Sequence, residues 1–218
     1  MHLTKQILVL FALKEEAAPF RKIAAGRPGV TILLTGIGKK NAEKAIRAAL
    51  AASRPDLVLT CGFAGGLEPS LPHGEVIFST DDSELQTQNS ELKTRLIAAG
   101  TREGKFFCAD RVAVTAQEKQ KLWQQTGADA VEMESGAIRA VCRELGIPSA
   151  TVRVISDTAG EDLPLDFNAL SKPDQSLDFG KLALAIVKSP GKIGALLRLQ
   201  KQTSAAAGRL AAVLKAVG

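Results

Sequence analysis

The sequence predicts an α/β fold of three layers, in which helices cover both faces of a central mixed, largely parallel sheet. Three observations predict this class. Strand-like apolar runs alternate with helix-like segments, 45% of the residues are apolar and 23% charged, and 218 residues suit one domain with a substantial core. No internal repeat or low-complexity linker divides the chain, so residues 1–218 are expected to form a single domain.

The first strand is expected at residues 7–12, where an apolar run is followed by a charged, helix-like segment at 15–25. No small-residue cleavage site follows the run, which indicates a buried strand and not a signal peptide. No stretch approaches about 18 uninterrupted apolar residues, so a membrane-spanning helix is not expected.

Helix-capping residues and β-branched residues predict where the later helices and strands lie. Asn41 can cap a helix over 41–53, and Gly146 can end a helix over 134–145. The β-branched run at 148–155 is expected to be a central strand. The other expected strands lie at 30–35, 56–61, 75–80, 105–108 and 128–133, and the other helices at 89–99 and 117–125.

Composition narrows the chemistry that this chain can carry out. With only His2 and His73, a histidine-based zinc site or a Ser-His-Asp triad has few residues to draw on. Cys61, Cys108 and Cys142 form no CxxC pair, and their odd number argues against a disulfide framework. A reducing cytoplasm is therefore the expected location, and acid-base catalysis would fall mainly to carboxylates.

The basic character of the chain belongs to its tail. Asp178 is the last acidic residue, so residues 179–218 carry +7, whereas residues 1–178 carry −2 from 21 basic and 23 acidic side chains. The tail has helical apolar spacing, which Gly208 and residues 204–207 are expected to interrupt. Its charge fits a solvated helix face or contact with an anionic membrane or another anion. Nucleic acid is not expected, because the body is mildly acidic and aromatic residues are few.

A glycine-rich segment follows the expected strand at 56–61. Residues 62–66 read Gly-Phe-Ala-Gly-Gly, and we expect a loop there. Such a loop is either a tight turn or a binding loop whose amides point at an anion. The spacing matches neither the dinucleotide-binding nor the P-loop pattern.

Charged residues stand where expected strands end, which is the edge at which open α/β sheets bind ligands. Glu16 opens a helix, where it can oppose the helix dipole or act as a general base. Glu132 and Glu134 would share one face of a strand and can accept hydrogen bonds from vicinal hydroxyls, although Glu134 also suits a helix start. Arg153 lies inside a strand, where charges are seldom free, and Asp157 can protonate a leaving group or begin a turn.

Taken together, five segments resemble the purine nucleoside phosphorylase and uridine phosphorylase superfamily, and most nearly its 5'-methylthioadenosine/S-adenosylhomocysteine nucleosidase branch. The segments occur in the family's order and cover most of residues 6–160. They are ALKEE at 12–16, GIGK at 36–39, GFAGGL at 62–67, VEME at 131–134 and VRVISD at 152–157.

The resemblance implies hydrolysis of the N-glycosidic bond of a purine nucleoside, with no metal or cofactor. It implies that Asp157 protonates or hydrogen-bonds the purine N7, that Glu16 activates water, and that Glu134 accepts from the ribose hydroxyls. Met133 would pack on the sugar, and Arg153 would fix carboxylates within the site. The remaining implied substrate contacts are Gly62, Phe63, Ala64, Gly65, Val112, Glu132 and Ser156.

Two other activities stay open at this level. A phosphorylase of the same fold would need arginines around its nucleophile, and the superfamily's phosphorylases usually carry a GDPxR-type phosphate loop early in the chain. Here the corresponding segment is FALKEE, and its carboxylate suits water better than phosphate. A module that only binds nucleosides would not need the three carboxylates. By the same resemblance, a homodimer is expected.

Some features depart from the nucleosidase pattern. Phe63 replaces a usual serine, Val112 stands where an aromatic residue usually stacks on adenine, and the segment between 75 and 110 is short. The tail resembles a second branch, the hopanoid-associated nucleosidases or phosphorylases, which are thought to release adenine from adenosylhopane. That likeness rests on LP at 163–164, KPDQSLD at 172–178 and SPGKIGALLRL at 189–199. A lipid-linked adenosine is therefore the alternative substrate.

Overall fold

The computed structural model of the protein describes residues 5–80, 86–170, 172 and 178–217. Eight strands form one sheet with the order β2-β1-β3-β8-β4-β5, in which β7 also pairs with β3 and β6 pairs with β7. Pairing is antiparallel only between β3 and β7 and between β4 and β8, so the sheet is mixed and largely parallel, as predicted. The strands are β1 (Ile7–Phe11), β2 (Val30–Leu34), β3 (Leu57–Gly66), β4 (Val76–Thr80), β5 (Arg102–Glu103), β6 (Phe106–Cys108), β7 (Ala130–Glu132) and β8 (Ser149–Asp157).

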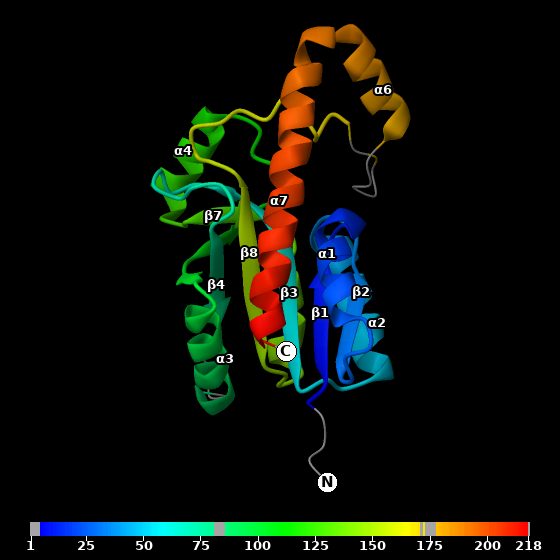
Figure 1. Cartoon of the computed structure of the whole chain (residues 1–218), viewed down its shortest axis with the longest axis vertical. Helices are drawn as coiled ribbons and strands as arrows, with labels where there is room; N and C mark the ends of the chain where they lie inside the picture. The colour runs from blue at the N-terminus through cyan, green and yellow to red at the C-terminus, as the bar shows by residue number, and fades with distance from the viewer. Residues whose placement is uncertain (1–4, 81–85, 171, 173–177, 218) are drawn as a thin grey trace.

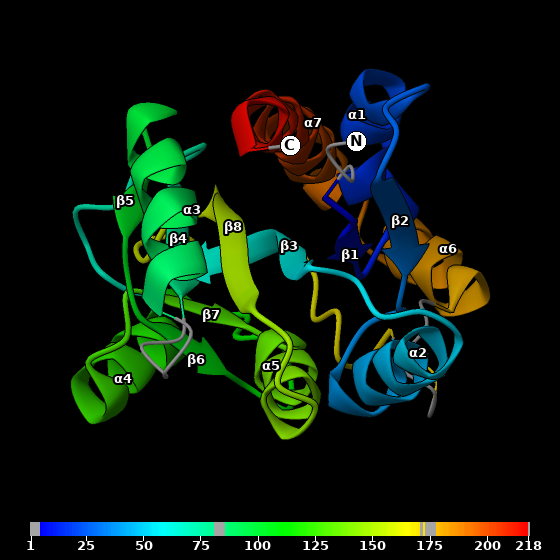
Figure 2. The ribbon, with the colours of Figure 1, turned by 90° about the horizontal axis from the view of Figure 1, so that it is seen from below.

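Helices cover both faces of this sheet (Figure 1). Seen along the strands, α1 and α7 lie over one face and α2 and α5 over the other (Figure 2). The predicted three-layer arrangement is therefore confirmed. The helices are α1 (Lys14–Ala24), α2 (Lys39–Ala52), α3 (Gln86–Ala98), α4 (Ala116–Thr126), α5 (Ser135–Glu144), α6 (Phe179–Lys188), the short 3₁₀ helix η1 (Pro190–Lys192) and α7 (Ile193–Val217).

Strand β1 shows why the sheet is buried on both sides. Its five residues are all apolar and buried, and successive side chains enter opposite layers. Val9 and Phe11 pack in the cluster that includes Ala17 and Leu210, from the helices on one face. Leu8 and Leu10 pack with a separate cluster on the other face, formed with α2 and α5.

The glycine-rich segment at 62–66 is not a loop, so that expectation is wrong. Strand β3 continues to Gly66, and this extension pairs with β8 on one side and with β7 on the other. Pairing on both sides satisfies the backbone hydrogen bonds of this segment, and this outweighs the low preference of glycine for strands. The residues predicted as a loop are instead strand backbone beside the carboxyl end of β8.

Two other local expectations are also wrong. Asn41 does not cap α2: Gly38 occupies the N-cap with φ +87, and the Asn41 amide donates to the Ile37 carbonyl at 2.8 Å from inside the first turns. Gly208 and residues 204–207 do not interrupt the tail helix, because Ala206, Ala207 and Leu210 are buried in the core and packing holds α7 continuous. Of the KPDQSLD segment, residues 173–177 lie outside the described residues.

Candidate active site

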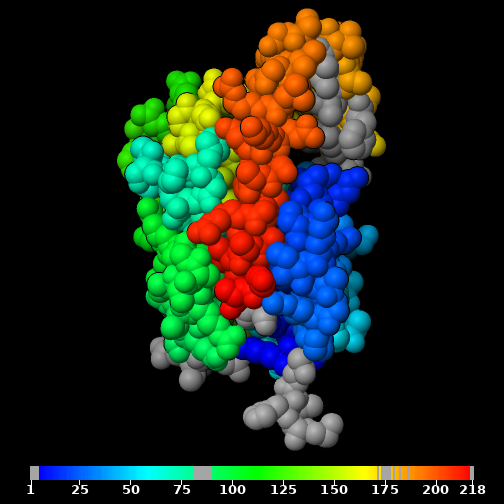
Figure 3. All heavy atoms as spheres, in the orientation of Figure 1, coloured from blue at the N-terminus to red at the C-terminus, as the bar shows by residue number. Residues whose placement is uncertain are grey.

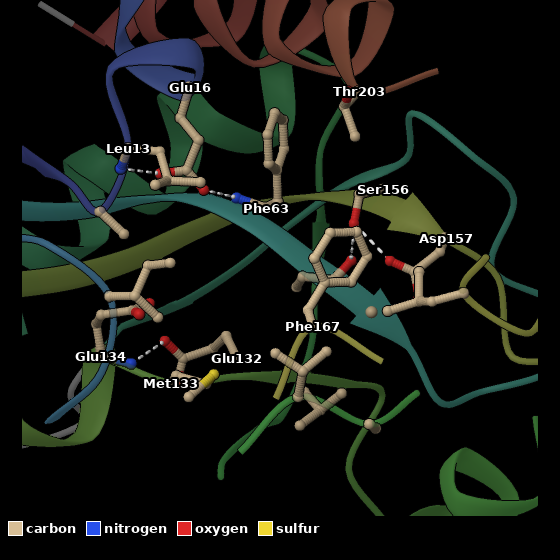
Figure 4. A pocket seen from close by; sticks show the side chains of 18 of the residues that line it. Leu13, Glu16, Phe63, Glu132, Met133, Glu134, Ser156, Asp157, Phe167 and Thr203 are labelled. Carbon is tan, nitrogen blue, oxygen red and sulfur yellow. Dashed lines mark hydrogen bonds between the residues drawn. The ribbon is translucent and has the colours of Figure 1, made fainter. Parts of the chain in front are cut away.

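A cavity of about 260 Å³ opens where β1, β3 and β8 end, and the N-terminal part of α7 forms one of its walls (Figure 4). Ten of the twelve residues predicted for the site line it, whereas Gly62 and Arg153 do not. Most of the lining is apolar, and its carboxylates come from three parts of the chain, with Glu132 and Glu134 in the same part. The ten are Glu16, Phe63, Ala64, Gly65, Val112, Glu132, Met133, Glu134, Ser156 and Asp157.

Arg153 lies in β8 beneath the cavity and is only 1% exposed. Its Nη2 atom donates to Glu132 Oε2 at 2.6 Å and to Glu134 Oε2 at 3.2 Å, while Nη1 donates to the Cys61 carbonyl at 3.2 Å. Burial would lower the pKa of this guanidinium, but the charges of Glu132, Glu134 and Glu16 outweigh burial and raise it. One buried cation thus faces three carboxylates.

Glu132 is the most fully bonded of the three carboxylates. Besides Arg153, it accepts hydrogen bonds from the backbone amides of Glu134 at 3.0 Å and Ser135 at 2.7 Å, and from Ser135 Oγ at 2.7 Å. Burial works to raise its pKa, yet Arg153 and these donors prevail and hold the pKa below its ordinary value. Ser135, at the start of α5, was not among the predicted residues. Glu132 therefore anchors the turn from β7 into α5.

Glu134 is the N-cap residue of α5 and is 5% exposed. Its Oε1 atom accepts from the Gly38 amide at 2.8 Å, which connects the GIGK segment to the cavity. Burial raises the pKa of this carboxyl, although Arg153 opposes the shift. Glu132 and Glu134 are not an equivalent pair, because the pKa of Glu132 is lowered and that of Glu134 is raised.

Glu16 projects from the first turn of α1 and is 4% exposed. Its two oxygens accept from the Phe63 amide at 2.8 Å and the Leu13 amide at 2.9 Å. Burial raises the pKa of this carboxyl to about 7, against the opposing effect of Arg153 and the two amides. A carboxyl with such a pKa can exchange a proton near neutral pH, which a solvated helix-start glutamate cannot.

Gly62 explains how Glu16 and Arg153 approach the same strand. Its φ is +148, and a Cβ there would lie 2.5 Å from Arg153 Nη1 and 2.7 Å from Glu16 Oε1. Gly65 lies in the same way beside Asp157, because a Cβ added at Gly65 would lie 3.2 Å from Asp157 Oδ2. These glycines leave room for charged groups against the sheet.

Asp157 ends β8 on the far side of the cavity from Glu16 (Figure 4). Its Oδ1 accepts from Ser156 Oγ at 2.6 Å, and its Oδ2 forms an ion pair with Lys119 Nζ at 2.5 Å. Lys119 comes from α4, is 0% exposed, and also donates to the carbonyls of Thr158 and Glu161 at 2.8 Å each. Sequence reasoning missed Lys119, because a lysine in a polar helix is indistinguishable from a surface lysine.

Other cavity residues were also missed. Phe167, Leu199 and Thr203 line the cavity, the last two from α7. Asn168 holds the Val112 backbone by accepting from its amide at 2.9 Å and donating to its carbonyl at 3.0 Å. The helical apolar spacing around Leu199 was visible in the sequence, but only the fold shows that part of this helix turns toward the cavity.

The chain belongs to the phosphorylase superfamily, whose family model matches residues 11–188. Among curated proteins, the 5'-methylthioadenosine/S-adenosylhomocysteine nucleosidase of an Exiguobacterium species is 26% identical over 191 residues, which cover 75% of this chain and 82% of that protein. The enzyme of the same name from Anoxybacillus flavithermus is 27% identical over 212 residues and covers 74% and 89%.

Solved structures show the same fold. The Neisseria meningitidis 5'-methylthioadenosine/S-adenosylhomocysteine nucleosidase, in complex with methylthio-immucillin-A, superposes with a TM-score of 0.69 at 20% identity, covering 98% of both chains. The futalosine hydrolase of Helicobacter pylori gives 0.68 at 19% identity, covering 98% of this chain and 99% of that chain.

Proposed function

We propose that this protein hydrolyses the N-glycosidic bond of a purine nucleoside. The observation that carries the proposal is the placement of Glu16 and Asp157 at opposite sides of one apolar cavity, in different electrostatic surroundings. Two carboxyl groups in unlike environments suit separate base and acid roles. The curated relatives named as nucleosidases support this reaction class.

Each role follows from the contacts of the residue. Glu16, with its pKa near neutrality, takes a proton from the attacking water. Asp157 delivers a proton, or a hydrogen bond, to the purine N7 as the bond to the sugar breaks. Glu134 accepts from the ribose hydroxyls, and its charge stabilises the developing oxocarbenium ion. Arg153 touches the carboxylates from below and acts as a positioning residue.

Water is the proposed nucleophile, and phosphate is the alternative. The side of the cavity beside the Phe63 amide holds Glu16, whose negative form repels phosphate. Arg153 is already bonded to Glu132 and Glu134. Arg111, which does line the cavity, is paired with Glu118 at 2.5 Å. The cationic groups beside this cavity therefore already have anionic partners.

The substrate we propose is an adenine nucleoside with an uncharged 5' substituent, of the methylthioadenosine type. Leu13, Phe63, Leu163, Phe167 and Leu199 give the cavity an apolar wall, and a volume of about 260 Å³ suits a ligand of this size. Phe167 supplies an aromatic ring in a site where Val112 cannot stack on a base. Lipid-linked adenosine is the second candidate, because α7 forms part of the wall and continues out of the body.

The test is release of adenine from methylthioadenosine, S-adenosylhomocysteine and 5'-deoxyadenosine, with and without phosphate, followed by chromatography. We expect free base and free sugar without phosphate. We expect kcat to fall about 10²–10⁴-fold in Glu16→Gln and in Asp157→Asn, while calorimetry still detects nucleoside binding. Glu15→Gln and Asp110→Asn are matched controls, since both side chains are exposed.

The outcomes separate the alternatives. Sugar 1-phosphate formed only with phosphate would replace hydrolysis by phosphorolysis. Full activity in both site variants would show that Glu16 and Asp157 are not the acid and base. Release only from a lipid-linked adenosine would favour the second substrate. A homodimer and a cytoplasmic location remain predictions, which size-exclusion chromatography with light scattering and cell fractionation test.

A further inference from the structure

We propose that the C-terminal hairpin, defined as residues 179–201, is a docking surface for an anionic membrane. This segment comprises α6, η1 and the first turns of α7. It projects beyond the body of the molecule, as the ribbon and the space-filling view both show (Figures 1 and 3). The rest of α7 has one buried face: Ala206, Leu210 and Leu214 are at most 3% exposed and pack in the core. The C-terminal part of α7 is therefore packed against the core, and its first turns project from the body as part of the hairpin.

Large apolar side chains are concentrated on the hairpin. Leu184 is 53% exposed, Val187 76%, Ile193 43% and Leu197 61%. These are four of the nine exposed large hydrophobic side chains in the described part of the chain, although the hairpin is only a tenth of its length. No helix in that described part is long and apolar enough to cross a membrane. Apolar side chains on a short projecting element suit insertion at a lipid interface.

The charge of the hairpin selects the partner. Lys181, Lys188, Lys192, Arg198 and Lys201 are exposed, and residues 179–201 contain no acidic residue. Each basic side chain near an anionic bilayer contributes about 1 kcal/mol of attraction. A second copy of the hairpin would instead bring like charges together. Exposed apolar side chains flanked by basic ones fit an anionic bilayer, which has negative headgroups over an apolar interior.

Docking would also bring the cavity close to the membrane. Leu199 and Thr203 line the cavity from the same helix that carries Ile193 and Leu197. Thr203 follows Ile193 by ten residues, or about 15 Å of helix. Membrane docking would be independent of the proposed nucleosidase activity, because it requires only the exposed side chains of the hairpin.

The test is flotation of the full chain with vesicles of phosphatidylcholine alone, or of phosphatidylcholine and phosphatidylglycerol in equal parts. We expect binding to the anionic vesicles at low salt and a loss of binding near about 0.5 M salt, where screening shortens the reach of the charges. Lys188→Glu with Lys192→Glu should weaken this binding about tenfold or more. Val187→Asp with Leu197→Asp should weaken it as well, because inserted apolar area is lost.

The matched control is Lys40→Glu with Lys44→Glu, which makes the same charge change at exposed positions of α2. It should bind vesicles like the wild type. Equal binding to neutral vesicles, equal loss in the control, or unchanged binding in both hairpin variants would overturn the proposal. Absence of vesicle binding together with hairpin-dependent self-association in size-exclusion chromatography would overturn it in favour of a second copy. Thermal unfolding of every variant confirms that the fold is retained.

Discussion

The two sides of the cavity bury charge in different ways. On one side, a single guanidinium, Arg153, serves the carboxylates of Glu132, Glu134 and Glu16. On the other side, Asp157 has an ammonium group to itself, that of Lys119. Arg153 and the other donors hold the pKa of Glu132 below its ordinary value. At Glu134 and Glu16 the effect of burial is larger than that of Arg153, and their pKa values are raised.

This difference shows how one cavity can hold acids of unlike behaviour. Glu132, which has Arg153 and several other donors, keeps a pKa below its ordinary value, whereas an acid left with too little compensation gains affinity for a proton. The number of cations within reach therefore matters as much as the number of acids.

The largest expected effect comes from removing the shared cation. Arg153→Met leaves three buried carboxylates without their shared cation, so the free energy of unfolding should fall by about 3–5 kcal/mol at pH 7. The loss should be smaller at pH 5, because Glu16, with its pKa of about 7, is protonated there and no longer needs the cation. Urea unfolding at both pH values measures it.

Lys39→Met is the control for that variant, because it breaks the exposed ion pair with Asp110. Its cost should be below about 1 kcal/mol and nearly the same at both pH values. If Arg153→Met were as stable as the control variant, the three acids would not depend on one cation, and the contrast between the two sides would be lost.

The next effect follows from the pKa of Glu16. Its ordinary value is 4.5 and its value in the folded protein is about 7, so between these the folded chain holds a proton that the unfolded chain has released. Stability therefore falls as pH rises through this window, by up to about 3 kcal/mol in total. Relative to Glu16→Gln, the wild type should lose this amount between pH 4 and pH 8 in urea unfolding.

Activity should change with pH in the opposite direction. Only ionised Glu16 accepts a proton from water, so kcat/KM of the wild type should fall below pH 7. A stability difference between wild type and Glu16→Gln that stays constant with pH would show that Glu16 has an ordinary pKa. Its assignment as the base would then lose its physical support.

Much of this site was predictable from the sequence, for a physical reason. Glu16 and Asp157 stand beside the ends of apolar runs, and parallel strands bring such ends to one edge of the sheet. Glu134 follows β7, which is antiparallel to β3, so its place was implied by the family resemblance instead. Arg153 was noticeable because a charge inside a strand needs a partner. The continuation of β3 through Gly66 was not predictable, because it depends on pairing with β7 and β8, which are distant in sequence.

Lys119 was unpredictable for a different reason. Its neighbours in α4 are polar, and burial of its side chain depends on the loop after β8, which supplies the carbonyls of Thr158 and Glu161. No periodicity within a helix reports a contact to a segment about forty residues away. The dedicated partner of Asp157 is therefore visible only in the fold.

Removing Lys119 is expected to have the smallest effect, and it tests most directly whether Asp157 has a cation of its own. Lys119→Met should lower kcat about 10–100-fold with little change in KM, and Lys119→Arg should keep more of the activity because it retains the charge. A purely structural lysine would lower kcat by the same factor in any background. In Asp157→Asn, where the carboxylate is already gone, Lys119→Met should lower kcat little further. An undiminished loss in that background would mean that Lys119 supports the fold of the loop after β8, and that Asp157 has no cation reserved for it.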